Sequence, residues 1–221
     1  MKRKPILTPE EQERIRKAVE EAERKTSGEI VPYIVEQSDR YEVAHWRGAT
    51  LGILIGMLIA AGVYLFYQGW GLEWLHQEWG LLTFLLVLGI LGMTLAYLVP
   101  PVRRFLAGED NLIEQVHKRA MMAFVEEEVF NTRDRTGILI FVSLFERRIE
   151  VIGDAGINQR VKSEEWVDIV LHIREGIRKG RLAEALVEAI HEAGALLERS
   201  QVTIRPDDTD ELANKVRLRK R

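Results

Sequence analysis

Three carboxylates flank apolar segments of this sequence at positions where they could bind a cation. Glu29 opens the segment EIVPYIVE, Asp134 comes shortly before GILIFVSL, and Asp154 follows RRIEVIG. If the first two segments are parallel strands and the third is antiparallel to them, the three carboxylates lie at one edge of a sheet. Carboxylate oxygens are preferred ligands of hard cations, and a site built from loops favours Ca2+ over Mg2+. The sequence therefore predicts a calcium site formed by Glu29, Asp134 and Asp154.

Two other interpretations of this region remain open. The three acidic residues could be solvated turn residues that pair with Arg133, Arg135 or Arg160. Open α/β sheets also bind ligands more often at the opposite edge, where the carboxyl ends of the parallel strands lie. The residues expected at that edge form the alternative site: Ser38, Asp39, Ser143 and Glu146.

The sequence contains no recognised catalytic motif. It has no Gly-x-Ser-x-Gly elbow, no glycine-rich phosphate loop and no His-Glu-x-x-His pattern, and cysteine is absent. Cysteine nucleophiles, disulfides and cysteine-bound metals are therefore excluded. A net charge of −3 gives no reason to expect nucleic acid as a partner.

Local patterns predict an α/β fold. Thr8, Pro9 and Glu11 form a strong helix start with a capping box, and apolar residues then recur at helical spacing. The segments 29–36, 137–144 and 148–152 are predicted strands, and amphipathic helices are expected over 110–130, 163–177 and 181–199. This order predicts a three-layer α/β sandwich with a small mixed sheet, interrupted by a helical hairpin.

Residues 48–99 form that hairpin and are predicted to cross a membrane twice. Two apolar runs without Asp, Glu, Lys, Arg or His have the length of about 20 residues that a membrane span needs. Arg40, Arg47, Arg103 and Arg104 flank the runs, whereas the loop between them has no Lys or Arg. Because Lys and Arg resist translocation, both termini are expected in the cytoplasm, with the spans in a bacterial inner membrane.

The small residues of the first span recur at every fourth position, as Gly48, Gly52, Gly56 and Ala60. Such a ridge allows another helix to approach closely. Its partner could be the ridge of Gly89, Gly92 and Ala96 within the hairpin, or a second copy of the chain, which would make a homo-oligomer. Glycine is also frequent in membrane helices without any such role.

The remaining segments are expected to form one discontinuous domain. Neither part of the chain beside the hairpin has enough strands to fold alone, so residues 5–45 and 103–200 are predicted to combine into one domain. The parallel strands would be joined by a crossover that contains the hairpin. Residues 201–221 are polar and end in a basic cluster, and we expect a tail that is disordered or bound to a surface.

Several stretches together resemble the TPM domain. They are SGEIVPYIVE, a long helix ending in FNTRDRTGILIFVS, then RRIEVIGDAGI, and the helix KGRLAEALVEAIHEAGALL. The order of elements is similar to a bacterial subgroup in which a membrane hairpin interrupts the domain. The resemblance implies assembly or repair of membrane complexes, binding of divalent cations, or acid phosphatase activity. Many members have Asp-Asn-Gly before the central strand, where this chain has Arg135-Thr136-Gly137.

Two functions follow as hypotheses. The first is a membrane-anchored interaction module at the inner membrane face, which assists assembly, repair or regulation of an unidentified membrane protein complex and binds Ca2+ as its only expected cofactor. The alternative is a metal-dependent hydrolase similar to an acid phosphatase. Turnover of a generic phosphomonoester in the presence of Mg2+ or Ca2+ would separate the two.

Overall fold

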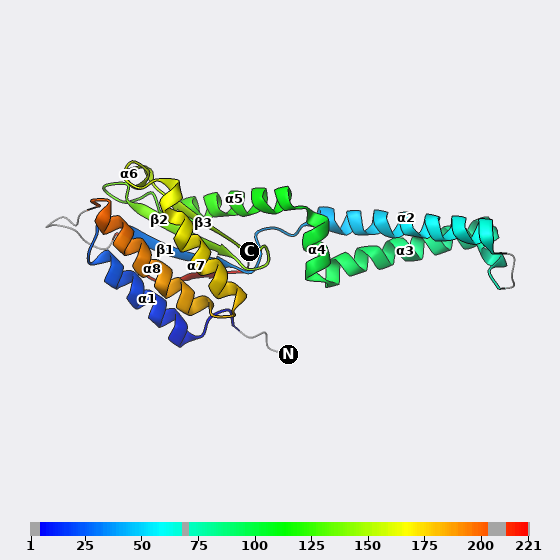
Figure 1. The fold of residues 1–221 in the computed structure, drawn as a ribbon, viewed down its shortest axis with the longest axis horizontal. Helices are drawn as coiled ribbons and strands as arrows, with labels where there is room; N and C mark the ends of the chain where they lie inside the picture. Colours follow the sequence, from blue (N-terminus) through cyan, green and yellow to red (C-terminus); the bar gives the residue numbers. More distant parts are fainter. Residues whose placement is uncertain (1–4, 68–70, 203–210, 221) are drawn as a thin grey trace. The chain divides into compact units, whose positions relative to one another are not determined.

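The computed structural model describes residues 5–67, 71–202 and 211–220. They divide into two compact units, one built from residues up to 39 and from 113 onward, the other from residues 40–112. Figure 1 shows the helices and strands, which follow one another along the chain in this order: α1 (Pro9–Glu23), β1 (Glu29–Val35), α2 (Glu42–Phe66), η1 (Glu73–His76), α3 (Glu78–Leu98), α4 (Pro100–Ala107), α5 (Glu109–Glu126), β2 (Gly137–Ser143), β3 (Arg148–Gly153), α6 (Ala155–Asn158), η2 (Ser163–Trp166), α7 (Val167–Arg178), α8 (Leu182–Arg199) and β4 (Arg217–Arg219).

A four-stranded mixed sheet, in the order β3-β2-β1-β4, is the centre of the first unit. β1 and β2 are parallel, with pairs running from Glu29↔Gly137 to Val35↔Ser143. β3 returns antiparallel to β2, so that Gly153 lies opposite Ile138. The start of β1, the start of β2 and the end of β3 therefore share one edge. The prediction of an α/β protein with a small mixed sheet is confirmed.

Helices cover both faces of this sheet (Figure 1), and β1 and β2 are accordingly buried at every position. One face presents Ile30, Ile34, Ile138, Ile140 and Val142 to a core that includes α1, α7 and α8. The other presents Val31, Tyr33, Val35, Leu139 and Phe141 to Val116, Ala120 and Ala123 of α5. Successive residues of a strand point to opposite faces, so each strand supplies both cores.

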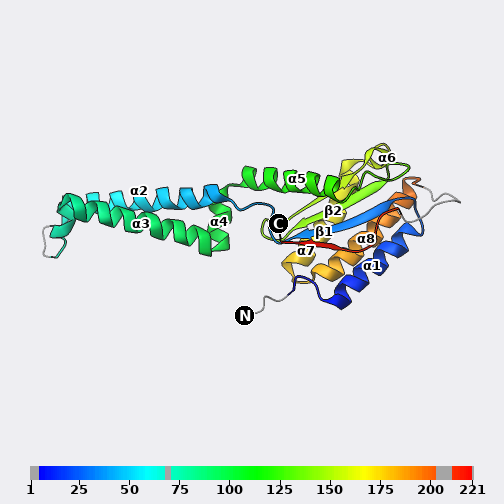
Figure 2. The same cartoon turned by 180° about the vertical axis from the view of Figure 1, so that it is seen from behind.

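The C-terminal segment corrects the prediction of a disordered or surface-bound tail. Residues 217–219 form β4, which pairs in parallel with Tyr33–Val35 of β1 (Figure 2). β1 therefore lies inside the sheet. The N–H of Glu36 donates to the Arg219 carbonyl at 3.1 Å, so the nitrogen of Pro32, four residues earlier, faces the same side. Pro32 precedes Tyr33–Val35, the residues of β1 that pair with β4. Its missing N–H therefore leaves no hydrogen bond of the sheet unmade. Residues 203–210 of the tail lie outside the described residues.

The second unit is built on the hairpin of α2 and α3. Both helices are long and apolar enough to cross a membrane, a criterion that core helices of soluble proteins also meet. The helices begin and end close to the limits that the sequence predicts, although α2 begins earlier, at Glu42. The side chains that face away from the partner helix are exposed and apolar, such as Leu58 and Leu86.

The two helices contact each other through their glycines. An ideal Cβ on Gly52 would lie 2.1 Å from the Leu88 carbonyl oxygen, and one on Gly92 would lie 2.2 Å from the Gly48 carbonyl oxygen. These are distances that a side chain cannot adopt, so glycine is required for the backbones to pack this closely. Gly48, Gly52 and Gly56 therefore contact α3 of the same chain. Association of copies through the ridge that also includes Ala60 stays a prediction.

Candidate functional site

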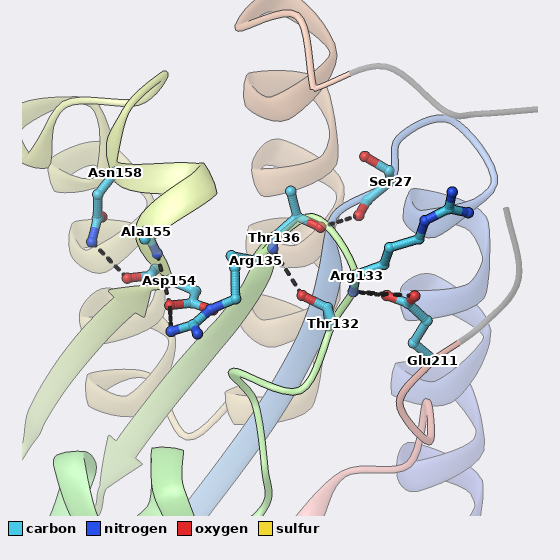
Figure 3. Close-up of polar contacts among 10 residues, drawn as sticks. Ser27, Thr132, Arg133, Arg135, Thr136, Asp154, Ala155, Asn158 and Glu211 are labelled. Atoms are coloured by element: carbon cyan, nitrogen blue, oxygen red, sulfur yellow. Dashed lines mark hydrogen bonds and ion pairs between the residues drawn. The ribbon is translucent and has the colours of Figure 1, made fainter.

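The amino edge of the sheet carries the three predicted metal ligands, since Glu29 begins β1, Asp134 precedes β2 and Asp154 follows β3. Asp154 is 6 % exposed and is the N-cap of the short helix α6, where its Oδ1 accepts the N–H of Ala155 at 2.7 Å. The same carboxylate receives both Nε and a terminal nitrogen of Arg135, the latter at 2.9 Å (Figure 3). This bidentate pair raises the pKa of Arg135, through the hydrogen bond first and the charge of Asp154 second.

The backbone around Arg135 is shaped to make this pair. Arg135 has a φ of 57°, in the left-handed region that few residues other than glycine adopt. Its carbonyl accepts the N–H of Gly156 at 2.9 Å, and an ideal Cβ on Gly156 would lie 2.3 Å from the Asp134 carbonyl oxygen. A glycine is thus needed where α6 approaches the loop that contains Asp134. The strained turn and the close contact together direct the guanidinium to Asp154.

Glu29 is held by the C-terminal segment. Its two carboxylate oxygens accept the backbone N–H groups of Glu211 and Leu212, each at 3.2 Å. The Glu211 carboxylate in turn accepts the N–H of Arg133, at 3.1 and 3.2 Å (Figure 3). The edge is therefore joined by contacts between three segments that lie far apart in the sequence.

Hydroxyl groups complete this edge. The Thr132 hydroxyl accepts the N–H of Thr136 at 2.9 Å, and the Thr136 hydroxyl donates to the Ser27 carbonyl at 2.6 Å (Figure 3). Within residues 5–67, 71–202 and 211–220, no three His, Cys, Asp or Glu side chains are grouped so that they could hold a metal ion. Calcium binding by Glu29, Asp134 and Asp154 stays a prediction, and the pairing of Asp154 with Arg135 is one that the sequence also suggests.

The carboxyl edge brings together three of the four residues of the alternative site. The Ser38 hydroxyl donates to the Ser143 hydroxyl at 2.9 Å, and the Ser143 hydroxyl donates to Oε2 of Glu146. Oε1 of Glu146 accepts the N–H of Ser38 at 2.9 Å. All three side chains are buried. Asp39, the fourth residue, follows in the connection to α2.

This chain of hydrogen bonds could pass a proton from Ser38 to the Glu146 carboxylate. Ser38 is 7 % exposed and Ser143 is fully buried, so a substrate could reach the hydroxyls only if the edge opened. Each buried polar atom of the cluster has a partner, which is the arrangement that stabilises a fold. The cluster ties the end of β1 to the turn between β2 and β3.

A comparison with family models finds a similarity over part of the chain. Residues 98–196 match the TPM domain. The matched range runs from the last residue of α3 into α8 and includes β2 and β3. β1 and α1 precede the hairpin and lie outside the matched range, yet β1 pairs with β2 along its whole length.

The solved structures add a similarity of fold. The NMR structure of the BA42 protein from the psychrophilic bacterium Bizionia argentinensis matches with a TM-score of 0.59 at 22 % identity, and the match covers 98 % of each chain. No curated protein sequence matches this chain significantly.

A further polar cluster of the first unit was not expected from the sequence. The Tyr33 hydroxyl accepts a hydrogen bond from Arg119 of α5 at 2.6 Å, and Glu127 accepts from both Arg217 and Arg219 of β4, each at 3.1 Å. Tyr33 and then Glu127 raise the pKa of Arg219. The alternation of apolar and basic residues in VRLR is the pattern of a strand with one polar face, and it could have indicated β4.

Proposed function

We propose that this protein is a membrane-anchored TPM domain protein, in which the α2–α3 hairpin holds an interaction module at the inner face of a bacterial membrane. One observation carries the proposal. In the most apolar stretch of α2 only 6 % of the residues are buried, and in that of α3 only 11 % are. Leu58 is 74 % and Leu86 62 % exposed. A hairpin with such an outer surface is stable in hydrocarbon and would aggregate in water.

The hairpin acts as an anchor. The polar side chains within its spans are those of Thr50, Thr83 and Thr94, and each hydroxyl donates to the carbonyl four residues earlier in its own helix, at 2.7 to 3.0 Å. Each of these three hydroxyls therefore has its hydrogen bond within its own helix. None of them requires a transported ion or a partner helix as a ligand. Transport proteins place ionisable groups at membrane depth, and the sequences of both spans lack them.

The distribution of arginine supports a cytoplasmic position for the TPM domain. Residues 40–47 and 97–108 contain four arginines, whereas residues 67–79 contain no Lys or Arg. This asymmetry favours an orientation in which both ends of the hairpin stay in the cytoplasm. The partner would then be a membrane protein reached by lateral diffusion, and the TPM domain would present its α/β surface to that protein.

A metal-dependent hydrolase ranks second. Hydrolysis at the amino edge would require carboxylates that can exchange their present partners for a metal, and Asp154 and Glu29 are engaged by Arg135 and by backbone N–H groups. A phosphomonoester assay of the purified protein with Mg2+ or Ca2+ tests this alternative directly. Turnover that depends on the metal and is lost in Asp154→Ala would favour the hydrolase.

Membrane anchoring is tested by fractionation. Membranes from cells that produce the full chain are washed with alkaline carbonate, which removes peripheral proteins and leaves spanning proteins in the pellet. We expect the protein in the pellet, a C-terminal reporter in the cytoplasm, and a reporter inserted near His76 outside. Release by carbonate would overturn the anchor, and a C-terminal reporter outside would overturn the orientation alone.

A further inference from the structure

Residues 211–220 dock on the side of β1 that faces away from β2 (Figure 2). They contribute β4, which pairs with β1 at three positions, from Tyr33↔Arg217 to Val35↔Arg219, whereas β2 pairs with β1 at seven. Beyond β4, the N–H of Glu36 donates to the Arg219 carbonyl at 3.1 Å. A strand contact of this length is weak by itself, so side chains must add to it.

Glu127, which follows α5, binds two arginines of β4. Its Oε2 accepts from Nε of Arg217 and its Oε1 accepts from a terminal nitrogen of Arg219, each at 3.1 Å. The side chains of Glu127 and Arg217 are 15 % and 5 % exposed. Removal of one partner from an ion pair that is covered this well is costly, because the other charge stays behind. Glu127 therefore selects an extended segment that carries cations at two alternate positions.

The residues that alternate with these arginines are apolar. Val216 is 9 % exposed and Leu218 is partly buried, and both pack against the core that includes α1, α7 and α8. At the start of the segment, Glu29 accepts the N–H groups of Glu211 and Leu212, a contact with the main chain that any extended segment can make. The surface beside β1 thus recognises an extended chain in which apolar residues alternate with arginine.

We propose that this side of β1 is a docking site for an extended segment of the membrane protein partner, in which apolar residues alternate with arginine, and that residues 211–220 occupy the site until the partner segment replaces them. The proposal rests on the proposed interaction module and adds to it the chemistry of the partner. The charge complementarity between Glu127 and the two arginines of β4 defines this chemistry.

The protein's own segment makes docking conditional on a nearby partner. Eight residues, 203–210, connect it to Val202. A segment on so short a connection competes with a free ligand as if it were present at about millimolar concentration. A partner segment reaches a comparable local concentration when both proteins are held in the same membrane. Residues 211–220 therefore exclude soluble ligands and yield to a partner that diffuses beside the hairpin.

Replacement of the segment is measured with the full chain in detergent and a fluorescein-labelled synthetic peptide of residues 211–220, ELANKVRLRK. The double variant Arg217→Gln with Arg219→Gln weakens the protein's own segment and leaves Glu127 intact. We expect this variant to bind the peptide about tenfold or more tightly than the wild type does, as measured by fluorescence anisotropy. A loss of contacts within the chain would then produce a gain of binding, which a purely structural β4 does not predict.

Three controls isolate the contact with Glu127. Glu127→Gln removes the carboxylate itself, and we expect it to release the segment without binding the peptide. Arg178→Gln with Lys179→Gln is the matched control, because these two cations also pair with a single carboxylate, that of Glu175 on α7. It should bind the peptide as weakly as the wild type does. A peptide with glutamine in place of both arginines should not bind the double variant, and equal binding of this peptide would overturn the proposal.

Hydrogen exchange shows whether the segment has left. The Glu36 amide should exchange faster in the double variant and slow down again when the peptide binds. The amides of β2 should stay protected throughout, which excludes unfolding of the sheet. A Glu36 amide that stays protected in the double variant would overturn the proposal, and so would a released segment without peptide binding.

A second copy of the chain is the other occupant that these variants identify. A wild type that is dimeric in detergent by light scattering, and monomeric as the double variant, would assign the site to residues 211–220 of a second copy and overturn the proposed partner segment. Peptide binding does not depend on membrane insertion, which carbonate extraction tests. Peptide binding by a protein that carbonate releases would overturn the anchor and leave the docking site in place.

Discussion

The helix pairs α1–α8 and α2–α3 pack through a similar contact but have different outer surfaces. Both bring glycine to the point of closest contact: an ideal Cβ on Gly194 of α8 would lie 2.9 Å from Cβ of Ala22, and one on Gly52 would lie 2.1 Å from the Leu88 carbonyl oxygen. Outside the contact the two pairs have opposite chemistry. α1 pairs Arg16 with Glu13 and Glu20, whereas the hairpin exposes leucine and isoleucine.

This difference shows that the outward face of a helix, and not its packing contact, indicates the surroundings of the helix. Close contact between helices depends on shape alone, so small residues serve a water-exposed pair and a membrane pair equally. The outward face must suit the solvent, and it is charged on α1 and apolar on α2. The first unit and the hairpin thus follow one packing rule, and they differ in the chemistry of their outer surfaces.

The largest effect is expected from a charge on the outer face of the hairpin. Leu58→Lys should cost about 3 kcal/mol of insertion free energy, because a lysine near the centre of a span is poorly tolerated. The fraction of protein resistant to carbonate extraction measures it. The matched control is Leu171→Lys on α7, where a leucine 49 % exposed lies in the TPM domain and a lysine should change little. Equal resistance of the two variants to carbonate extraction would contradict the difference between the outer faces of the hairpin and of α7.

The next effect concerns the shared packing rule. Gly52→Ala should destabilise the hairpin by about 2 kcal/mol, since the new Cβ meets a backbone carbonyl that cannot move aside without separating the helices. Thermal unfolding in detergent, followed by the fluorescence of the hairpin tryptophans, measures the change. Gly62→Ala is the control, because nothing lies within 4 Å of a Cβ at Gly62. A control as unstable as Gly52→Ala would show that helix flexibility, and not contact, requires the glycines.

Gly194→Ala tests the same rule in the TPM domain and should cost about 1 kcal/mol. Overpacking against Ala22 opposes the gain in helix propensity that alanine brings, which is up to about 1 kcal/mol. The methyl group of Ala22 can yield further than the backbone carbonyl at Gly52, so the loss should be the smaller of the two. Denaturant unfolding of the full chain, followed by hydrogen exchange of the backbone amides of α8, gives the free energy. A gain in stability would show that the contact between α1 and α8 is loose.

The main elements of the fold could be predicted from local patterns. The capping box at Thr8 and Glu11 is present, and β1, β2 and β3 lie within one residue of their predicted limits. Apolar strands with turn residues at both ends carry a strong local signal, and a crossover connection requires parallel pairing. These features depend on neighbours in the sequence, and they were therefore accessible.

Features that depend on distant partners were missed or left open. β4 has only three residues, and it exists because β1 supplies hydrogen bonds and Glu127 pairs with Arg217 and Arg219. α4 was not predicted: Pro100 and Pro101 begin it, and Arg47, distant in the sequence, donates to the carbonyl of Leu106 near its end. At the amino edge, the pairing of Asp154 with Arg135 instead of a metal depends on the left-handed backbone of Arg135. No pattern of residue types specifies that conformation.

The smallest effect concerns the pH dependence of the contact between α7 and α8 in the first unit. His172 of α7 lies with Nδ1 2.8 Å from Oε1 of Glu192 on α8, and this hydrogen bond, followed by the charge of Glu192, raises the pKa of His172. A pKa that is higher in the folded state than the ordinary value of about 6.5 contributes stability below pH 6.5 and loses it as the pH rises through the folded value. Both side chains are more than one third exposed, so the contribution stays below about 1 kcal/mol.

Denaturant unfolding of the full chain from pH 5.5 to 8.5 should show the loss of stability for the wild type and not for Glu192→Gln. A pH dependence that persists in Glu192→Gln would assign the effect to another group of the TPM domain.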